Sequence, residues 1–167
     1  MINKSRFCLY LFDFDGTLVG QNHWSGYWKN TISAFKDGPY INPHEYDIRW
    51  SILTARPRID IPVIKTVCAF HGLRPKYVIT SPMLRWDASK TIEDYLDMKV
   101  QIISNIVQGN DARFPEIEKV YYIDNDLDVV SYMNSKRRIA NGDQYQIMPF
   151  ISFTTIDFVK GTYDLFM

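Results

Sequence analysis

The chain has 167 residues, and its 19 basic and 19 acidic side chains give a formal net charge of zero. A neutral chain has no overall field to draw it onto nucleic acid or an anionic membrane, although a local patch can still do so. The length predicts one domain, residues 1–167, whose core needs no disulfide or metal to stabilise it. Hydrophobic residues make up 46% of the chain, as in ordinary globular proteins.

The two cysteines, Cys8 and Cys68, lie within apolar runs, which predicts buried free thiols. Without a disulfide pattern we expect a reducing compartment. The apolar stretch 7–14 is too short to span a membrane and is interrupted by Asp13. We therefore expect a cytoplasmic protein with no membrane partner.

Strand-like and helix-like segments alternate along the chain. Residues 7–12 are all apolar, which is typical of a strand buried on both faces of a parallel sheet. The elements expected after it are a helix over 24–35, a strand over 49–53, a helix over 61–71, a strand over 77–79, a helix over 94–108, a strand over 120–123, a helix over 127–134 and a strand near 145–148. This alternation predicts an α/β fold with three layers, a doubly wound and mainly parallel sheet between helices on both faces.

Polar residues follow three of the predicted strands directly. In parallel sheets, ligands bind beyond the carboxyl ends of the strands, so we expect these side chains to converge on one edge. They are Asp13 and Asp15, Thr54 and Arg56, and Asp124 and Asn125.

Asp13 and Asp15 follow the buried strand, and Phe14 between them should turn into the core if the strand pleat continues. Two such carboxylates repel each other unless a cation or a shared proton offsets the charge. One of them can attack phosphorus while the other donates and accepts protons. Mg²⁺ is a hard cation that suits carboxylate ligands of this kind. Gly16 permits close approach of the backbone, and Thr17 can hydrogen-bond the loop or a ligand. An ordinary turn rich in Asp and Gly is the alternative.

The segment 11–18, Leu-Phe-Asp-Phe-Asp-Gly-Thr-Leu, resembles the first motif of haloacid dehalogenase-like phosphatases. The resemblance implies a doubly wound sheet, Mg²⁺ as cofactor and an aspartyl-phosphate intermediate on Asp13. It also implies that Asp15 is the acid/base partner, as in phosphotransfer members of the family.

The segment 51–57, Ser-Ile-Leu-Thr-Ala-Arg-Pro, resembles the second motif of that family. The resemblance implies that the Thr54 hydroxyl holds a phosphoryl oxygen, with Ala55 beside it. Arg56 offers a fork of donors to a phosphate. A strand end with a proline-terminated turn is the alternative.

Two lysines are candidates for the third motif, a lysine at a helix start that neutralises the nucleophile and the phosphate. Lys99 lies in a segment that resembles RNA-repair-like and polynucleotide 3′-phosphatase members of the family. Lys90 follows Asp87 and Ser89, either of which can cap a helix. We favour Lys99.

The segment 121–128 resembles the fourth motif, which supplies metal ligands. The resemblance implies that Asp13, Asp15 and Asp124 bind the metal, with Asn125 and Asp128 as further ligands and Asp126 as an alternative. Asn125 stands where the family usually has a second acid, and an amide oxygen brings no charge. A helix start decorated with acids is the alternative.

The spacing of the motifs leaves no room for a large cap domain over the site. An open site suits a bulky phosphorylated substrate, such as a nucleic-acid 3′-phosphate end. Arg56, Arg58 and Arg85 could follow its backbone. The aromatic pairs His23-Trp24 and Tyr27-Trp28 either stack on a base or pack into the core.

We therefore expect a Mg²⁺-dependent phosphatase, a phosphoric monoester hydrolase. A nucleotide or small-molecule phosphatase is one alternative. A phosphatase-like binding module with weakened metal chemistry is the other, because Asn125 carries no charge.

Overall fold

The computed structural model describes residues 8–20, 26–46, 49–115, 117, 119–136, 138–141, 144–147, 151–157 and 162–163. Its central sheet has the strand order β3-β2-β1-β4-β7-β8. The strands are β1 (Cys8–Phe12), β2 (Trp50–Leu53), β3 (Val78–Ile79), β4 (Lys119–Asp124), β7 (Ile151–Asp157) and β8 (Thr162–Tyr163). All pairs are parallel except β7 with β8, which confirms the predicted mainly parallel sheet.

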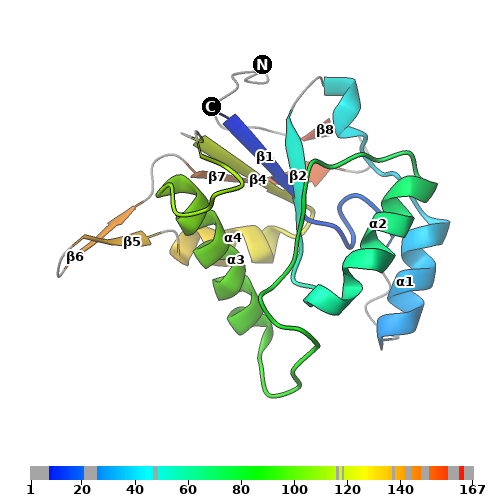
Figure 1. Ribbon diagram of the computed structural model, residues 1–167, viewed down its shortest axis with the longest axis horizontal. Coiled ribbons are helices and arrows are strands. Elements are labelled where there is room, and N and C mark those ends of the chain that lie inside the picture. The colour runs from blue at the N-terminus through cyan, green and yellow to red at the C-terminus, as the bar shows by residue number, and fades with distance from the viewer. Residues whose placement is uncertain are drawn as a thin grey trace.

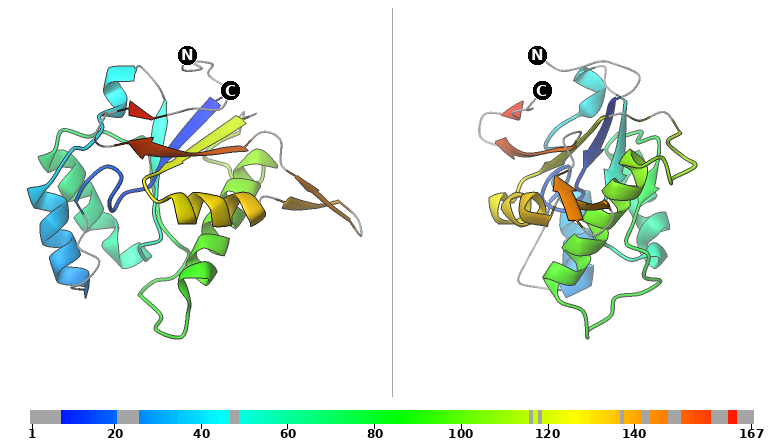
Figure 2. Two further views of the ribbon diagram at one scale, coloured as in Figure 1. Left: turned by 180° about the vertical axis from the view of Figure 1, so that it is seen from behind. Right: turned by 90° about the vertical axis from the view of Figure 1, so that its left-hand side faces the viewer.

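Helices cover both faces of the sheet, as predicted (Figures 1 and 2). Side chains alternate along β1, so Tyr10 and Phe12 face one side while Leu9 and Leu11 face the other. The first side packs against α1 (Gly26–Lys36) and α2 (Ile61–Phe70), and the second against α3 (Ile92–Val107) and α4 (Leu127–Lys136). The result is the three-layer, Rossmann-like α/β arrangement.

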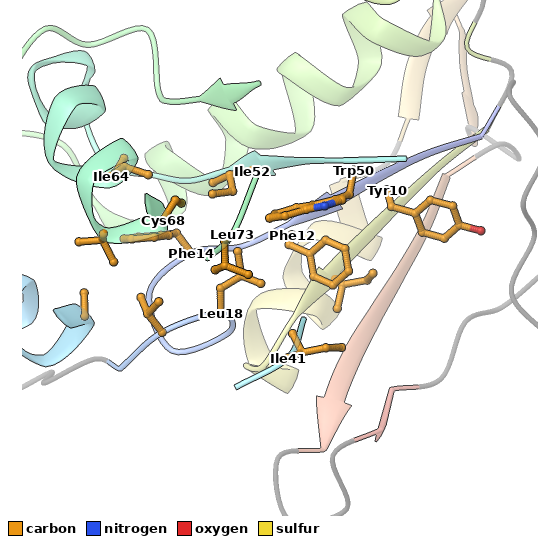
Figure 3. Close-up of a cluster of buried hydrophobic side chains, with 14 of the residues drawn as sticks. Tyr10, Phe12, Phe14, Leu18, Ile41, Trp50, Ile52, Ile64, Cys68 and Leu73 are labelled. Carbon is orange, nitrogen blue, oxygen red and sulfur yellow. The ribbon is translucent and has the colours of Figure 1, made fainter. Parts of the chain in front are cut away.

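The core on the α1 and α2 side is rich in aromatic residues. Figure 3 shows Phe12 edge-on against Trp50, with ring centroids 5.7 Å apart. Phe14, which lies between the two N-terminal aspartates, is fully buried in the same cluster. The strand pleat therefore continues past the end of β1 and turns Phe14 into the core, as the sequence predicts.

The start of α3 differs from the capping predicted from the sequence. Its N-cap is Thr91, which forms a capping box with Asp94, and not Asp87 or Ser89. The Asp87 carboxylate instead accepts hydrogen bonds from the backbone and hydroxyl of Ser89 in a local turn. Lys90 therefore precedes the helix and lies in an exposed turn.

The predicted strand near 145–148 corresponds to β6 (Gln144–Ile147), but it is not part of the main sheet. It pairs antiparallel with β5 (Arg138–Asn141) in a separate two-stranded hairpin. The strand that extends the sheet beyond β4 is β7, rich in β-branched residues, which the sequence analysis did not identify.

No large insertion covers the edge of the sheet within the described ranges. Between β1 and β2 these residues form α1 and the short 3₁₀ helix η1 (Pro43–Tyr46), and a second 3₁₀ helix, η2 (Arg58–Asp60), precedes α2. Among the described helices, none is both long enough and apolar enough to cross a membrane.

The α3 helix offers a matched test of the core. Ile103 is fully buried, whereas Ile92 on the same helix is 73% exposed. Because Ile103→Ala leaves a cavity, we expect the free energy of unfolding to fall by about 2–5 kcal/mol. Ile92→Ala should change it by less than about 0.5 kcal/mol. Urea unfolding followed by circular dichroism measures both, and equal losses would contradict the packing of α3.

Both cysteines are free and buried, as predicted. Burial raises the pKa of the Cys68 thiol to about 12, so at about pH 8 only ~1 in 10,000 of these thiols is ionised. We expect Ellman's reagent to leave the native protein unlabelled and to label both cysteines in guanidinium chloride. Rapid labelling of the native protein would show that these side chains are accessible.

Candidate functional site

The candidate site lies at the carboxyl end of β1, between β2 and β4. The chain proceeds from β1 to β2 and β3 on one side and reaches β4 on the other, so the strand order reverses here. Such a switch point is where open α/β sheets bind ligands. The backbone N–H of Asp13 donates to the carbonyl of Ile123 at 2.9 Å, which joins the ends of the two central strands.

Asp13 continues the alternation of Leu9 and Leu11, and its carboxylate lies on the α3 side of the sheet. Lys99 on α3 donates to its Oδ1 at 2.9 Å, and the Thr17 hydroxyl lies 3.2 Å from its Oδ2. Burial raises the pKa of Asp13, while the charge and hydrogen bond of Lys99 oppose that rise.

Lys99 is 3% exposed and also donates to the Tyr122 hydroxyl, at 2.7 Å. Tyr122 in turn donates to Asp124 Oδ2 at 2.5 Å. Asp124 is 2% exposed, and burial together with the charge of Asp13 raises its pKa to about 7. A continuous chain of hydrogen bonds thus connects the carboxylates at the ends of β1 and β4.

Thr17 connects the same two strand ends by a second route. Its hydroxyl accepts from the backbone N–H of Asn125 at 3.0 Å and lies 3.2 Å from both Asp13 Oδ2 and Asn125 Oδ1. A hydroxyl has one proton, so it donates to only one of these oxygens at a time. Gly16 precedes it with φ at 80°, a left-handed conformation that favours glycine.

Asp15 lies on the other side of the site, where Arg56 binds both of its oxygens at 2.7 Å. The buried guanidinium also donates to the Thr31 hydroxyl on α1, at 3.4 Å, and lies 3.6 Å from the Asp60 carboxylate. The predicted phosphate-binding arginine therefore contacts the predicted acid/base residue directly. Arg56 fixes the orientation of the Asp15 carboxylate.

Thr54 and Ala55 connect β2 to this arginine. The backbone N–H of Thr54 donates to Ile79 on β3, and its buried side-chain oxygen accepts from the backbone N–H of Arg56 at 3.2 Å. Because the Thr54 oxygen only accepts in this contact, its proton is available to another acceptor.

Other predicted site residues are placed elsewhere. Lys90 is exposed and Asp128 is exposed on the first turn of α4, and no contact within the described part of the chain joins either to Asp13. Asp126 caps α4 by accepting from the backbone of Asp128 and Val129, so the helix-start alternative is correct for Asp126. His23 and Trp24 lie outside the described residues, as do the side chains of Tyr27 and Trp28.

Sequence reasoning did not identify three partners of the predicted residues: Tyr122, Asp60 and Thr31. Tyr122 stands two residues before Asp124 on the same strand face, and this period-two spacing could have indicated it. Asp60 follows Arg56 at a spacing of four, which could have indicated an ion pair. We know of no sequence pattern that indicates Thr31.

Whether a metal cation fits at this edge of the sheet depends on the net charge of the side chains there. Among the described residues, the ion pairs of the site and the buried Asp124 bring together four carboxylates and two cations, namely Asp13, Asp15, Asp60, Asp124, Lys99 and Arg56. With all of them ionised, the carboxylates exceed the cations by two charges, the charge of one Mg²⁺ ion.

The atoms that could bind a metal ion are a separate question from the charge. Within the described ranges, no three His, Cys, Asp or Glu side chains are arranged to hold a metal ion. A Mg²⁺ site here would therefore combine the Asp13 carboxylate with the nearby amide oxygen of Asn125 and with backbone or water oxygens. These are hard ligands of the kind that Mg²⁺ prefers.

Comparison with models of known protein families finds no match. A search of curated proteins finds no significant relative either. The fold and the geometry of the site therefore carry the functional inference.

Two arginine pairs offer a matched test of the buried network. Arg56→Ala would remove the cation that pairs with Asp15 and with the buried Asp60, so we expect the free energy of unfolding to fall by about 3–5 kcal/mol. The control is Arg113→Ala, whose pair with Asp111 is partly exposed; it should lose no more than about 1 kcal/mol. Chemical unfolding measures both. A loss for Arg56→Ala no larger than for Arg113→Ala would contradict the role of this network.

Proposed function

We propose that the chain is a Mg²⁺-dependent phosphohydrolase of the haloacid dehalogenase-like type, with Asp13 as its nucleophile. The proposal rests on one observation, that side chains from separate elements meet at the Asp13 carboxylate at the switch point of the sheet. Lys99 binds this carboxylate directly, and Asn125 is connected to it through Thr17. The motif at 11–18 supports the same assignment.

In the first step an Asp13 carboxylate oxygen attacks the phosphorus atom, and the bond from phosphorus to the leaving oxygen breaks. The product on the protein is an aspartyl-phosphate. Lys99 offsets negative charge on Asp13 and on the incoming phosphate, which would otherwise repel each other. The contacts of Asp13 with Lys99 and with Thr17 restrict rotation of its carboxylate before the attack.

Asp15 supplies and removes the proton. In its protonated form it gives the proton to the leaving oxygen, and it later takes one from the water that attacks phosphorus. The bond from phosphorus to Asp13 then breaks, which releases phosphate and restores the carboxylate. In the structure Arg56 binds both Asp15 oxygens and so orients the carboxylate, and one of these two hydrogen bonds has to loosen when Asp15 carries the proton.

The Asp13 carboxylate and the Asn125 amide oxygen would hold Mg²⁺, with the charge of Asp124 behind them. When bound, the ion neutralises charge on the phosphoryl oxygens. The Thr54 hydroxyl, whose proton is not used by its contact with Arg56, is the group of this chain that we assign to a phosphoryl oxygen. The described residues form no large cap, which favours a bulky substrate such as a nucleic-acid 3′-phosphate end.

The nucleophile assignment predicts the effect of one substitution. Asp13→Asn keeps the size of the side chain but removes the attacking charge, so we expect Mg²⁺-dependent phosphate release to fall by about 10³-fold or more. The matched control is Asp97→Asn, which changes an exposed carboxylate on α3 and should leave turnover near that of the wild type. Release of inorganic phosphate from p-nitrophenyl phosphate and from a 3′-phosphorylated oligonucleotide measures both. Full turnover by Asp13→Asn would refute the assignment.

The same assay separates the proposal from its alternatives. A strict preference for mononucleotides would favour a nucleotide phosphatase. The neutral Asn125 is the observation that favours a phosphatase-like binding module. That alternative predicts no phosphate release from any substrate by the wild-type protein in saturating Mg²⁺.

A further inference from the structure

Two loop segments run side by side from the site to the surface. The backbone N–H of Ser81 donates to Arg56 at 3.1 Å, that of Arg58 to Met83 at 2.8 Å and that of Ile59 to Leu84 at 3.0 Å. The segment after β3 is therefore fixed along the segment after β2, beginning at the arginine that holds Asp15. Figures 1 and 2 show the loop between β3 and α3 projecting away from the sheet, beside the start of α2.

The far end of this loop is attached to α3. The Trp86 ring packs edge-on against Tyr95, with centroids 5.1 Å apart, and the Tyr95 hydroxyl accepts from the backbone N–H of Asp87 at 3.0 Å. Tyr95 lies one turn before Lys99 on the same helix face. The loop thus connects the Arg56 side of the site to the Lys99 side.

The side chains on this loop pair are exposed, and they are apolar or cationic. Ile59 is 46% exposed, Leu84 56% and Trp86 50%, and Arg58 and Arg85 are exposed between them. Within the described residues, no hydrogen bond or ion pair engages either guanidinium. We call these five residues the loop platform.

The chemistry of the loop platform favours one kind of partner. Exposed apolar side chains gathered on one surface mark an interaction site. Free guanidinium groups beside them favour a polyanion, and a half-exposed indole offers a face for stacking a base. None of the five residues is acidic, so nothing on the platform itself repels a phosphate. A single nucleic-acid strand presents both phosphates and stackable bases.

We propose that the loop platform binds a single-stranded nucleic-acid segment and directs its phosphate end to Asp13. A base stacks on Trp86 while Arg58 and Arg85 contact backbone phosphates. This inference rests on the proposed phosphohydrolase function for the reaction, but the binding itself can be measured without turnover.

The binding test uses fluorescence anisotropy with a labelled, single-stranded, 3′-phosphorylated oligonucleotide. Trp86→Leu keeps an apolar side chain but removes the ring, and we expect it to weaken binding by about 5- to 100-fold. Arg58→Gln with Arg85→Gln should flatten the slope of log affinity against log salt by about 0.7 for each phosphate that the arginines no longer neutralise. The controls are Phe70→Leu, at a similarly exposed ring on α2, and Arg113→Gln, both of which should bind as the wild type does.

A turnover test separates failure of this inference from failure of the proposed function. Platform variants should lower kcat/KM for the oligonucleotide more than for p-nitrophenyl phosphate, so the ratio of the two falls by about 5-fold or more. If the wild type hydrolyses neither substrate, the proposed function fails. The anisotropy measurement then still tests whether the loop platform binds nucleic acid.

Two results would overturn the inference. One is oligonucleotide binding that is unaffected both by Trp86→Leu and by the double arginine variant, with circular dichroism showing folded proteins. The other is tighter binding of a phosphopeptide of equal charge that depends on the same residues, which would identify a phosphoprotein as the partner.

Discussion

The burial of two carboxylates beside a single ammonium group is the constraint on which the rest of this site depends. Asp13 and Asp124 are both drawn out of water at the same sheet edge, and burial raises the pKa of each. Removing charge from water is costly unless hydrogen bonds or counter-charges replace the solvent. Lys99, Tyr122 and Thr17 supply those contacts, which hold the carboxylates of Asp13 and Asp124 in place.

The parallel fold creates that constraint. Strands with the order β3-β2-β1-β4 end at one edge, so residues far apart in sequence meet there without any loop having to carry them. The side-chain alternation of β1 and β4 then turns Asp13, Tyr122 and Asp124 toward α3, where Lys99 lies. What the sequence does show is the alternation of strand-like and helix-like segments, with polar residues directly after the strands, which is why the fold class and the convergence of the strand ends could be predicted. At the level of sequence, only the family resemblance favours Lys99 over Lys90.

The parts that could not be predicted depend on tertiary partners and not on local pattern. The sequence suggests that Arg56 meets a phosphate, but its planar fork matches a carboxylate equally well, and only the fold places Asp15 within reach. The run that forms β6 has the pattern of a sheet strand, yet it pairs locally in a hairpin while β7 joins the sheet. Local propensity predicts that a strand forms, and pairing decides where it lies.

Charge also explains how a neutral residue can stand at position 125. With Asn125, the four carboxylates of the site would exceed its two cations by two charges if all of them were ionised, and one divalent ion would balance that excess. An aspartate there would add a third uncompensated charge within hydrogen-bond reach of Thr17 and close to Asp13. An amide oxygen keeps a metal-binding atom in place without that repulsion. Under the proposed function, Asn125 is therefore compatible with a Mg²⁺ site, because its amide offers an oxygen ligand without adding charge beside the buried carboxylates of Asp13 and Asp124.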